Sequence, residues 1–393
     1  MSTEKNPVVS LISLFLGRAS IACVIVFATL VGCSDDSSSS RTVLQVAEPE
    51  PEPVPEPQTK PFQEIYDQGI TRFLGMYTPM LSEPEGDTVN HFFGAGDGPL
   101  CLDGGEYTMS TRDQGSEDLV IFLQGGGACW SELCAATTEA SPGLVSAGIM
   151  DPNRENNPVK DWNQVYLPYC DGGLFSSDRD TDSDGDGVDD RFQRGLHNLS
   201  AALDVALANF PAPRRILLTG SSAGAFGTIF ALPLVRYHYP DVRIDLVNDS
   251  GVGVSRPDDP SYQALLQEDW NSTAFIPASC EECVAADGHL TEYQIWQLDQ
   301  DENVRRGMLS YTRDNVIGDA FLQIGGDAFD AALTVEMKQL EDAHPTRQRS
   351  WIVEGAKHTF LMAEPDQTAG GVPLMDWITS MLDDSDDWVS VRD

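Results

Sequence analysis

The chain has 393 residues, of which 41% are hydrophobic, and 62 acidic against 24 basic residues give it a formal net charge of −38. This length and apolar content predict a folded protein of one or two domains rather than a disordered chain. The acidity disfavours binding to nucleic acid and to anionic membrane surfaces, because both of these partners are negatively charged.

The N-terminus has the pattern of an export signal. An uncharged apolar run from Ile21 to Gly32 is too short to span a bilayer and is typical of a signal peptide. It ends in Leu-Val-Gly-Cys33, which resembles the bacterial lipoprotein processing box. We expect residues 1–32 to be removed and Cys33 to be lipidated, which places the protein in the bacterial cell envelope. The alternative is ordinary secretion, with Cys33 left unlipidated in the discarded peptide.

Residues 33–61 are rich in Ser, Asp, Pro and Glu, including the stretch AEPEPEPVPEPQ. Alternating Pro and Glu favour an extended, self-repelling segment. We therefore expect a disordered tether that holds a folded domain, residues 62–393, away from the membrane. The lipid anchor would be the only contact with that membrane.

Beyond Cys33, six cysteines remain, and an even number in an exported chain indicates disulfides. Sequence proximity favours the pairs Cys129–Cys134 and Cys280–Cys283, which leaves Cys101–Cys170 as the third, although other connectivities stay open. The Cys-x-x-Cys at 280 could instead be half of a zinc site, but no second pair of ligands at suitable spacing accompanies it.

Strand and helix patterns alternate along the folded domain. Short apolar runs that predict buried strands are Asp118 to Gln124, Gln164 to Tyr169, Arg215 to Thr219, Arg243 to Val247, Gly307 to Thr312 and Ser350 to Val353. Helical spacing is present from Leu196 to Ala206 and from Ala225 to Arg236. The alternation predicts an α/β fold of the α/β-hydrolase type, with a mostly parallel central sheet and helices on both faces. Ligands bind such sheets at the carboxyl ends of the strands.

Gly220-Ser221-Ser222-Ala223-Gly224 contains a G-x-S-x-G motif between a predicted strand and a predicted helix. In this context the motif is a nucleophile elbow, a tight turn that exposes the hydroxyl at the strand end. Ser222 is therefore the candidate nucleophile. A glycine-rich turn with a structural serine is the alternative.

A serine nucleophile needs a base and an acid, which in this fold follow it in the order acid then histidine. Of the six histidines, only His358 stands just past the last predicted strand. Asp314, after the strand ending at Thr312, is our candidate for the acid. Asp327 and Asp330 compete if FLQIGG at 321 is a strand, although Ile317 to Ile324 has helical spacing ended by two glycines. Asp249 is a weaker candidate.

Gly125-Gly126-Gly127 follows a predicted strand and matches the glycine-rich oxyanion loop of esterases. Glycines let backbone N–H groups face an oxyanion without a side chain intervening. The expected donors are Gly126, Gly127 and Ala223. A phosphate-binding loop would instead end in Lys-Ser or Lys-Thr, which is absent here.

Taken together, these motifs resemble those of the pectin acetylesterase and Notum family. The shared motifs, in order, are CLDGG at 101, FLQGGGACW at 122, VYLPYC at 165, TGSSAG at 219, NDSG at 248 and GAKHTF at 355. The resemblance implies hydrolysis of carboxylic esters by a Ser-Asp-His triad, which falls on Ser222, Asp314 and His358. Plant members deacetylate pectin, and Notum removes a fatty acyl group from a secreted signalling protein.

Two departures from the family pattern border the expected pocket. Gly127 stands where an aromatic residue often follows the paired glycines, and CDGG at 170 replaces the usual polar run. We also expect residues 250–305 to form pocket walls. The substrate of a relative is therefore not transferred directly to this chain.

Residues 178–190 form an acidic segment that resembles calcium-binding loops. Asp182, Asp184, Asp186 and Asp190 alternate around glycines and could converge on a structural Ca²⁺ ion. A solvated acidic loop is the alternative, and Gln193 at the twelfth position argues against an EF-hand.

These patterns predict a serine carboxylesterase that needs no catalytic cofactor and hydrolyses acetyl or other short acyl esters, on a polysaccharide or on a small ester. The alternatives are a lipase-like deacylase for longer acyl chains and an inactive surface binding protein on the same fold.

Overall fold

The computed structural model describes residues 60–94, 96, 98–257, 259–284 and 288–393, which belong to one compact unit. The expected signal peptide at 1–32, the lipidation candidate Cys33 and nearly all of the expected tether at 33–61 lie outside the described residues. Across the described ranges, no helix combines the length and apolarity needed to cross a membrane.

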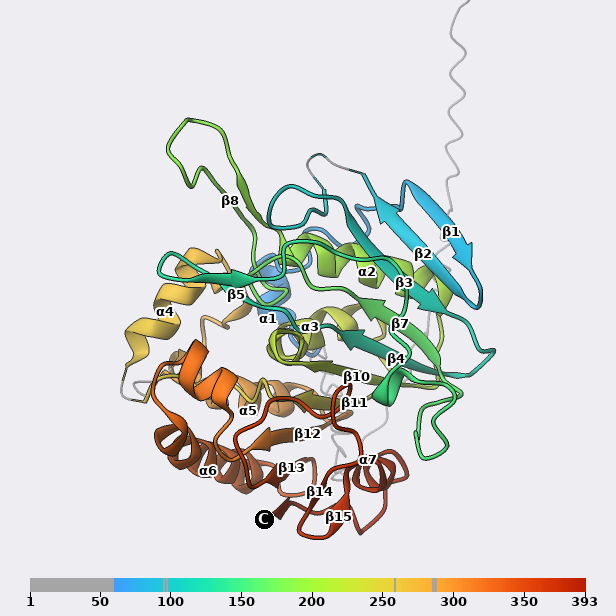
Figure 1. Ribbon diagram of the computed structural model, residues 1–393, viewed down its shortest axis with the longest axis vertical. Coiled ribbons are helices and arrows are strands. Elements are labelled where there is room, and N and C mark those ends of the chain that lie inside the picture. Colours follow the sequence, from blue (N-terminus) through green and yellow to red (C-terminus); the bar gives the residue numbers. More distant parts are fainter. Residues whose placement is uncertain (1–59, 95, 97, 258, 285–287) are drawn as a thin grey trace, which may run out of the picture. The chain divides into compact units, whose positions relative to one another are not determined.

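A ten-stranded sheet lies at the centre of the domain, in the order β1-β2-β3-β7-β4-β10-β11-β12-β13-β16 (Figure 1). Its strands are β1 (Leu81–Glu85), β2 (Thr88–Phe93), β3 (Tyr107–Arg112), β7 (Asn163–Leu167), β4 (Asp118–Leu123), β10 (Arg215–Ser221), β11 (Arg243–Asp249), β12 (Val304–Tyr311), β13 (Gln348–Val353) and β16 (Val391–Arg392). All neighbours from β7 to β16 are parallel, and the β1, β2, β3 and β7 pairings are antiparallel. The predicted mostly parallel α/β sheet is thus confirmed.

The apolar runs in the sequence correspond to strands that are buried on both faces. In β4, Leu119, Ile121 and Leu123 join one hydrophobic cluster, whereas Val120 and Phe122 join another. This alternation follows from the pleat, since successive side chains point to opposite faces. The sheet therefore separates two cores, and each core needs its own covering layer.

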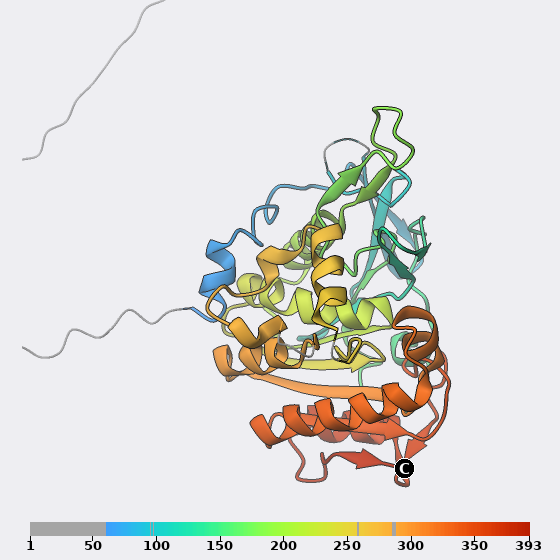
Figure 2. The ribbon, with the colours of Figure 1, turned by 90° about the vertical axis from the view of Figure 1, so that its left-hand side faces the viewer.

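Helices cover both faces, unevenly (Figures 1 and 2). The buried side chains of the first six α-helices join one core, and those of the seventh join the other. The helices are α1 (Gln63–Asp67), α2 (Gly195–Asn209), α3 (Ala223–His238), α4 (Pro260–Asp269), α5 (Thr291–Gln300), α6 (Gly326–Ala343) and α7 (Leu374–Leu382). Short 3₁₀ helices are Gly148–Met150, Thr273–Phe275 and Glu281–Val284, and Val316–Phe321 is a π-helix.

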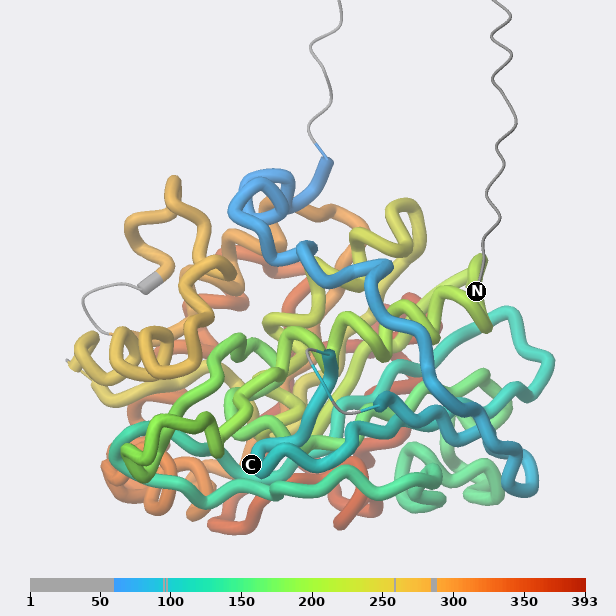
Figure 3. Tube along the Cα trace, turned by 90° about the horizontal axis from the view of Figure 1, so that it is seen from above, coloured from blue at the N-terminus to red at the C-terminus, as the bar shows by residue number. Residues whose placement is uncertain are grey.

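Three short hairpins complete the described elements: β5 (Gly127–Cys129) with β6 (Cys134–Ala136), β8 (Arg179–Thr181) with β9 (Arg191–Gln193), and β14 (Thr368–Ala369) with β15 (Val372–Pro373). The loop between β8 and β9 projects from the body of the domain in two perpendicular views (Figures 1 and 2). The N-terminal segment, in blue, runs along the outside from α1 toward β1 (Figure 3).

The structure contains the three disulfides that sequence proximity favoured. Cys129–Cys134 joins β5 to β6, Cys280–Cys283 lies in a 3₁₀ turn, and Cys101–Cys170 joins two distant segments. The Cys280 pair is therefore not half of a zinc site.

Candidate active site

Ser222 lies in a strained turn between β10 and α3. Its backbone has φ 58° and ψ −122°, a conformation that is costly for any residue with a side chain. The turn fits only because its neighbours are glycines: a Cβ on Gly224 would lie 2.0 Å from the carbonyl oxygen of Leu123, and one on Gly220 would lie 2.7 Å from the same oxygen. The motif thus forms the sharp strand-to-helix turn that it predicted.

His358 and Asp314 form a pair beyond the ends of β13 and β12, with Asp314 fully buried and His358 partly exposed. The imidazole Nδ1 donates to Asp314 Oδ2 at 2.7 Å. Asp314 Oδ1 accepts from the backbone N–H groups of Val316 and Ile317, both at 3.0 Å, at the start of the π-helix. These bonds hold a fully buried carboxylate in place, and the carboxylate in turn orients the ring.

The other nitrogen of the His358 ring, Nε2, is the candidate proton acceptor. His358 Nε2 is shielded from solvent and has no hydrogen-bond partner there. Because Nδ1–H donates to Asp314, Nε2 is the nitrogen that can accept a proton. The competing acids face elsewhere: Asp327 pairs with Arg313, and Asp330 pairs with Arg392.

Asp249, at the end of β11, connects the Ser222 turn to the His358 loop. Its backbone carbonyl accepts from Ser222 N at 2.8 Å, and its Oδ2 accepts from Ser221 Oγ at 2.7 Å. The same carboxylate accepts from the N–H groups of Phe360 at 3.0 Å and Leu361 at 2.9 Å. Ser222 and His358 therefore lie at the same rim of the sheet, each within two residues of a direct partner of Asp249.

Burial raises the pKa of Asp249, while the Ser221 hydroxyl, the two backbone N–H groups and the nearby His358 lower it. The donors stabilise the ionised form, and full burial destabilises it. Asp249 is thus a second carboxylate close to the imidazole, although its hydrogen bonds go to the backbone and to Ser221 rather than to the ring.

The predicted oxyanion donors lie around the turn but are not equivalent. Gly127 and Ala223 line the same cavity as Ser222. Gly127 has φ 81° and could carry no side chain, because its Cβ would lie 1.9 Å from the carbonyl oxygen of Ala135. Gly126 packs against Tyr169 and Thr137 and is not among the residues that line this cavity.

A cavity of about 200 Å³ opens beside Ser222. Its apolar lining includes Trp130, Leu133, Leu174, Phe226, Ile317 and Phe321. The expectation that residues 250–305 form its walls is wrong, since none of the described residues in that range lines it. The wall comes instead from the β5–β6 hairpin, the loop at Leu174, α3 and the π-helix.

The π-helix is the part of the site that sequence reasoning described least well. Helical spacing predicted a helix from Ile317 to Ile324, but the structure has one π-helical segment, Val316–Phe321, and α6 begins at Gly326. Such single π-turns are common at functional sites. Of the two departures that were expected to border the pocket, Gly127 lines the cavity, whereas the CDGG run at 170–173 does not.

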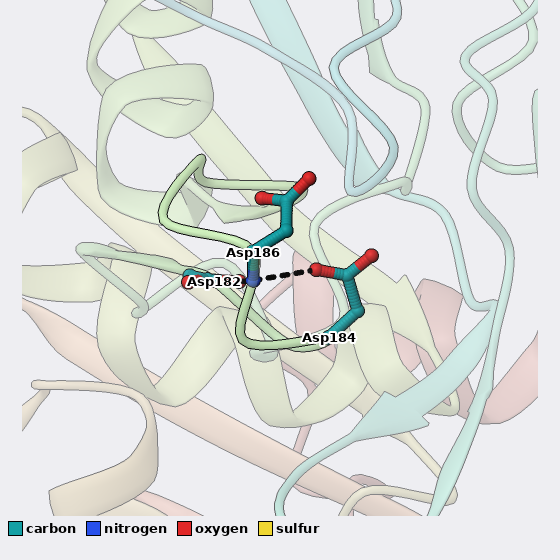
Figure 4. Close-up of side chains that lie close together, drawn as sticks. All are labelled: Asp182, Asp184 and Asp186. Atoms are coloured by element: carbon teal, nitrogen blue, oxygen red, sulfur yellow. Dashed lines mark hydrogen bonds between the residues drawn. The ribbon is translucent and has the colours of Figure 1, made fainter.

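The acidic loop brings three of its four candidate ligands together. Asp182, Asp184 and Asp186 each offer a carboxylate oxygen, and these oxygens lie within 4.8 Å of one another (Figure 4). Asp190 is not in this group; its carboxylate accepts from the backbone and side chain of Ser183. Carboxylate oxygens suit a hard cation, and calcium binding stays a prediction.

Residues 93–279 match the sequence model of the family described as Pectinacetylesterase. Pectin acetylesterase 4 of Arabidopsis thaliana is 30% identical over 169 residues, which are 39% of this chain and 41% of that protein. Pectin acetylesterase 11 of the same plant is 26% identical over 211 residues, 48% of this chain and 53% of that protein. Palmitoleoyl-protein carboxylesterase notum2 of Xenopus laevis is 28% identical over 152 residues, 34% and 30% of the two chains.

This chain thus spans about half or less of the length of these relatives. The matched segment contains the Ser222 turn and the glycine loop, while Asp314 and His358 lie beyond it. Over residues 93–279 the chain is thus similar in sequence to the pectin acetylesterase family, and its relatives include both pectin acetylesterases and Notum carboxylesterases.

Proposed function

We propose that this protein is a serine carboxylesterase. The observation that carries the proposal is the placement of Ser222, in a strained turn, at the same sheet rim as the His358–Asp314 pair, in which His358 Nε2 has no hydrogen-bond partner among the described residues. His358 removes the proton from Ser222 as the hydroxyl oxygen attacks the ester carbonyl. Asp314 holds the ring and stabilises the imidazolium that forms.

The tetrahedral intermediate places a negative charge on the former carbonyl oxygen. Backbone N–H groups of Gly127 and Ala223, which line the cavity, and of the adjacent Gly126 are the proposed donors to it. The imidazolium then protonates the leaving alcohol, and an acyl-enzyme forms. Water activated by His358 releases the acid and restores Ser222. These reaction steps use water and groups of this chain alone, without a cofactor.

The proposed substrate is an acetyl or other short acyl ester on a polysaccharide. Relatives with matching sequence are named pectin acetylesterases, which supports such a carrier. The second candidate is a longer acyl chain, which the apolar cavity of about 200 Å³ favours and which agrees with the palmitoleoyl-protein carboxylesterases among the relatives. A series of nitrophenyl esters of increasing acyl length distinguishes the two.

We also propose that the protein is exported and held by a lipid on Cys33, for which the processing box in the sequence is the support. Three disulfides in the described residues suit an oxidising compartment outside the cytoplasm.

The test of the serine mechanism is Ser222→Ala. We expect wild-type protein to be labelled by a fluorophosphonate, and the variant to lose both labelling and at least about 10⁴-fold in kcat. Because the substitution removes only the hydroxyl group, we expect the fold to stay intact, which circular dichroism would show. Ester hydrolysis by a folded Ser222→Ala protein, or no labelling of the wild type, would contradict the proposal; the latter favours an inactive binding protein.

A further inference from the structure

The cavity beside Ser222 and a second cavity share part of their walls. We name the cavity beside Ser222 the front cavity. A second one, the back cavity, is lined by residues that include Phe230, Leu266 and Leu290 and has room for about one water molecule. Leu174, Phe226 and Phe321 line both cavities. These three side chains therefore form the partition between the two.

Of these three residues, Phe321 is the one that can be substituted with the least effect on the surrounding backbone. Phe226 follows the nucleophile by four residues in α3, and Leu174 has a left-handed backbone with φ 56° in a tightly bonded loop. Phe321 is the last residue of the π-helix and is only partly buried. A change at this position thus alters the partition without altering the Ser222 turn.

The ring of Phe321 is held by aromatic neighbours on several sides. Its centroid lies 5.6 Å from that of Trp130, 5.8 Å from Phe226 and 6.1 Å from Tyr262, all with edge-to-face or steeply inclined rings. Trp130 and Phe226 line the front cavity, while Tyr262 lines the back cavity. The ring therefore fills the space through which the two cavities would otherwise connect.

We propose that Phe321 sets the upper limit on acyl-chain length by closing the front cavity against the back cavity. The proposal rests on the esterase function proposed above and adds the residue that determines its acyl specificity. A chain that reaches the partition must displace a packed ring, which is unfavourable. Without the ring, further methylenes can enter a mostly apolar space, and each one that is buried contributes up to about fourfold to kcat/KM.

The experiment compares Phe321→Ala with Leu322→Ala on nitrophenyl esters from acetate to dodecanoate. Leu322 is the matched control, because it is adjacent and buried but lines only the back cavity. We expect Phe321→Ala to have its highest kcat/KM on a longer acyl chain than the wild type. For chains beyond the wild-type optimum, each added methylene should raise the kcat/KM of the variant by up to about fourfold. Leu322→Ala should keep the wild-type order of substrates. If Phe321→Ala does not fold, Phe321→Leu gives the same comparison with a smaller opening.

An unchanged order of substrates in a folded Phe321 variant overturns the proposal, as does an equal shift in both variants, which would indicate general loosening. Failure of the underlying function looks different. In that case the wild type hydrolyses no ester of any length and Ser222 is not labelled by a fluorophosphonate, and the proposal for Phe321 is overturned with it.

Discussion

Asp249 shows how one buried residue can fix the geometry of a whole site. It makes no hydrogen bond to the proposed nucleophile's hydroxyl or to the imidazole, yet it accepts from the backbone N–H of Ser222 and from those of Phe360 and Leu361, just after His358. Ser250, the next residue, adds a bond from Thr359 N to its Oγ at 3.2 Å. Sequence reasoning considered Asp249 only as a possible triad acid, because a position after a strand does not reveal which groups a carboxylate will face.

Asp171 plays a comparable part in the loop that forms another wall of the site. It is fully buried, and its Oδ1 accepts from the N–H groups of Gly173 and Phe175 and from Ser177 Oγ. Its Oδ2 has no partner among the described residues. Burial raises the pKa of Asp171 to about 6, although these donors oppose the rise. Leu174, within the same loop, lines the front cavity.

The raised pKa predicts how Asp171→Asn will change stability with pH. The folded state binds the Asp171 proton more tightly than the unfolded state does, so stability from this group is present at low pH and is lost as pH rises toward and past about 6. The shift corresponds to about 3 kcal/mol. Urea unfolding should show the variant matching the wild type near pH 4 and exceeding it above neutral pH. A difference that does not vary with pH would refute this account.

At the scale of elements, the disulfides differ in what they constrain. Cys101–Cys170 closes a segment with a sequence separation of 69, whereas Cys129–Cys134 closes one of 5 within the hairpin that forms a wall of the front cavity. The cost of closing a loop in the unfolded chain grows with its length. The first bond should therefore matter more for stability, and the second more for the shape of the cavity.

Replacing each pair by serines tests this division. We expect the loss of Cys101–Cys170 to reduce the free energy of unfolding by about 4 kcal/mol and the loss of Cys129–Cys134 by about 2 kcal/mol, from loop entropy alone. For kcat/KM, measured at temperatures where both variants are folded, we expect the loss of Cys129–Cys134 to have the larger effect. Denaturant unfolding and ester hydrolysis on the same samples provide the measurement; the same order in both assays would count against the division of roles.

The elements that sequence predicted well are those with apolar residues in unbroken runs, such as β4, β10 and β11. Strand β3 was not predicted, because four of the six residues in its sequence YTMSTR are polar, although all six are buried. Its polar side chains find internal partners: Thr108 donates to the His91 carbonyl, Ser110 to Asn90 and Arg112 to Gln164. Hydropathy cannot detect a buried strand whose polar groups are paired across the sheet.

The parts of the site that could be predicted are those that depend on local sequence and strand order. The turn at Ser222 and the position of His358 follow from local sequence and from strand order, so both could be located in advance. The choice among Asp314, Asp327 and Asp330 depended on where the chain turns after β12. The π-helix, which decides this, has no pattern of its own that distinguishes it from an ordinary helix.

At the scale of the whole molecule, the dominant feature is negative charge. Only seven of the 62 acidic residues precede Lys60, so most of the charge belongs to the folded domain. Some of it lies beside the front cavity. Glu132 is exposed between the lining residues Trp130 and Leu133, and Asp319 is exposed on the π-helix. A polyanionic carrier would approach this rim against electrostatic repulsion.

The acidic rim predicts opposite salt responses for two kinds of acetylated polysaccharide. Screening is weak at about 0.01 M salt, where the Debye length is about 30 Å, and much stronger at about 0.15 M, where it is about 8 Å. We expect kcat/KM on acetylated polygalacturonate to rise about tenfold over this range, because screening removes the repulsion, while kcat/KM on neutral acetylated xylan changes by less than about twofold. Glu132→Gln with Asp319→Asn should reduce the rise without affecting the neutral substrate. If hydrolysis of the polyuronate instead slows as salt is added, attraction rather than repulsion governs its approach, and the carrier must bind at a basic surface away from this rim.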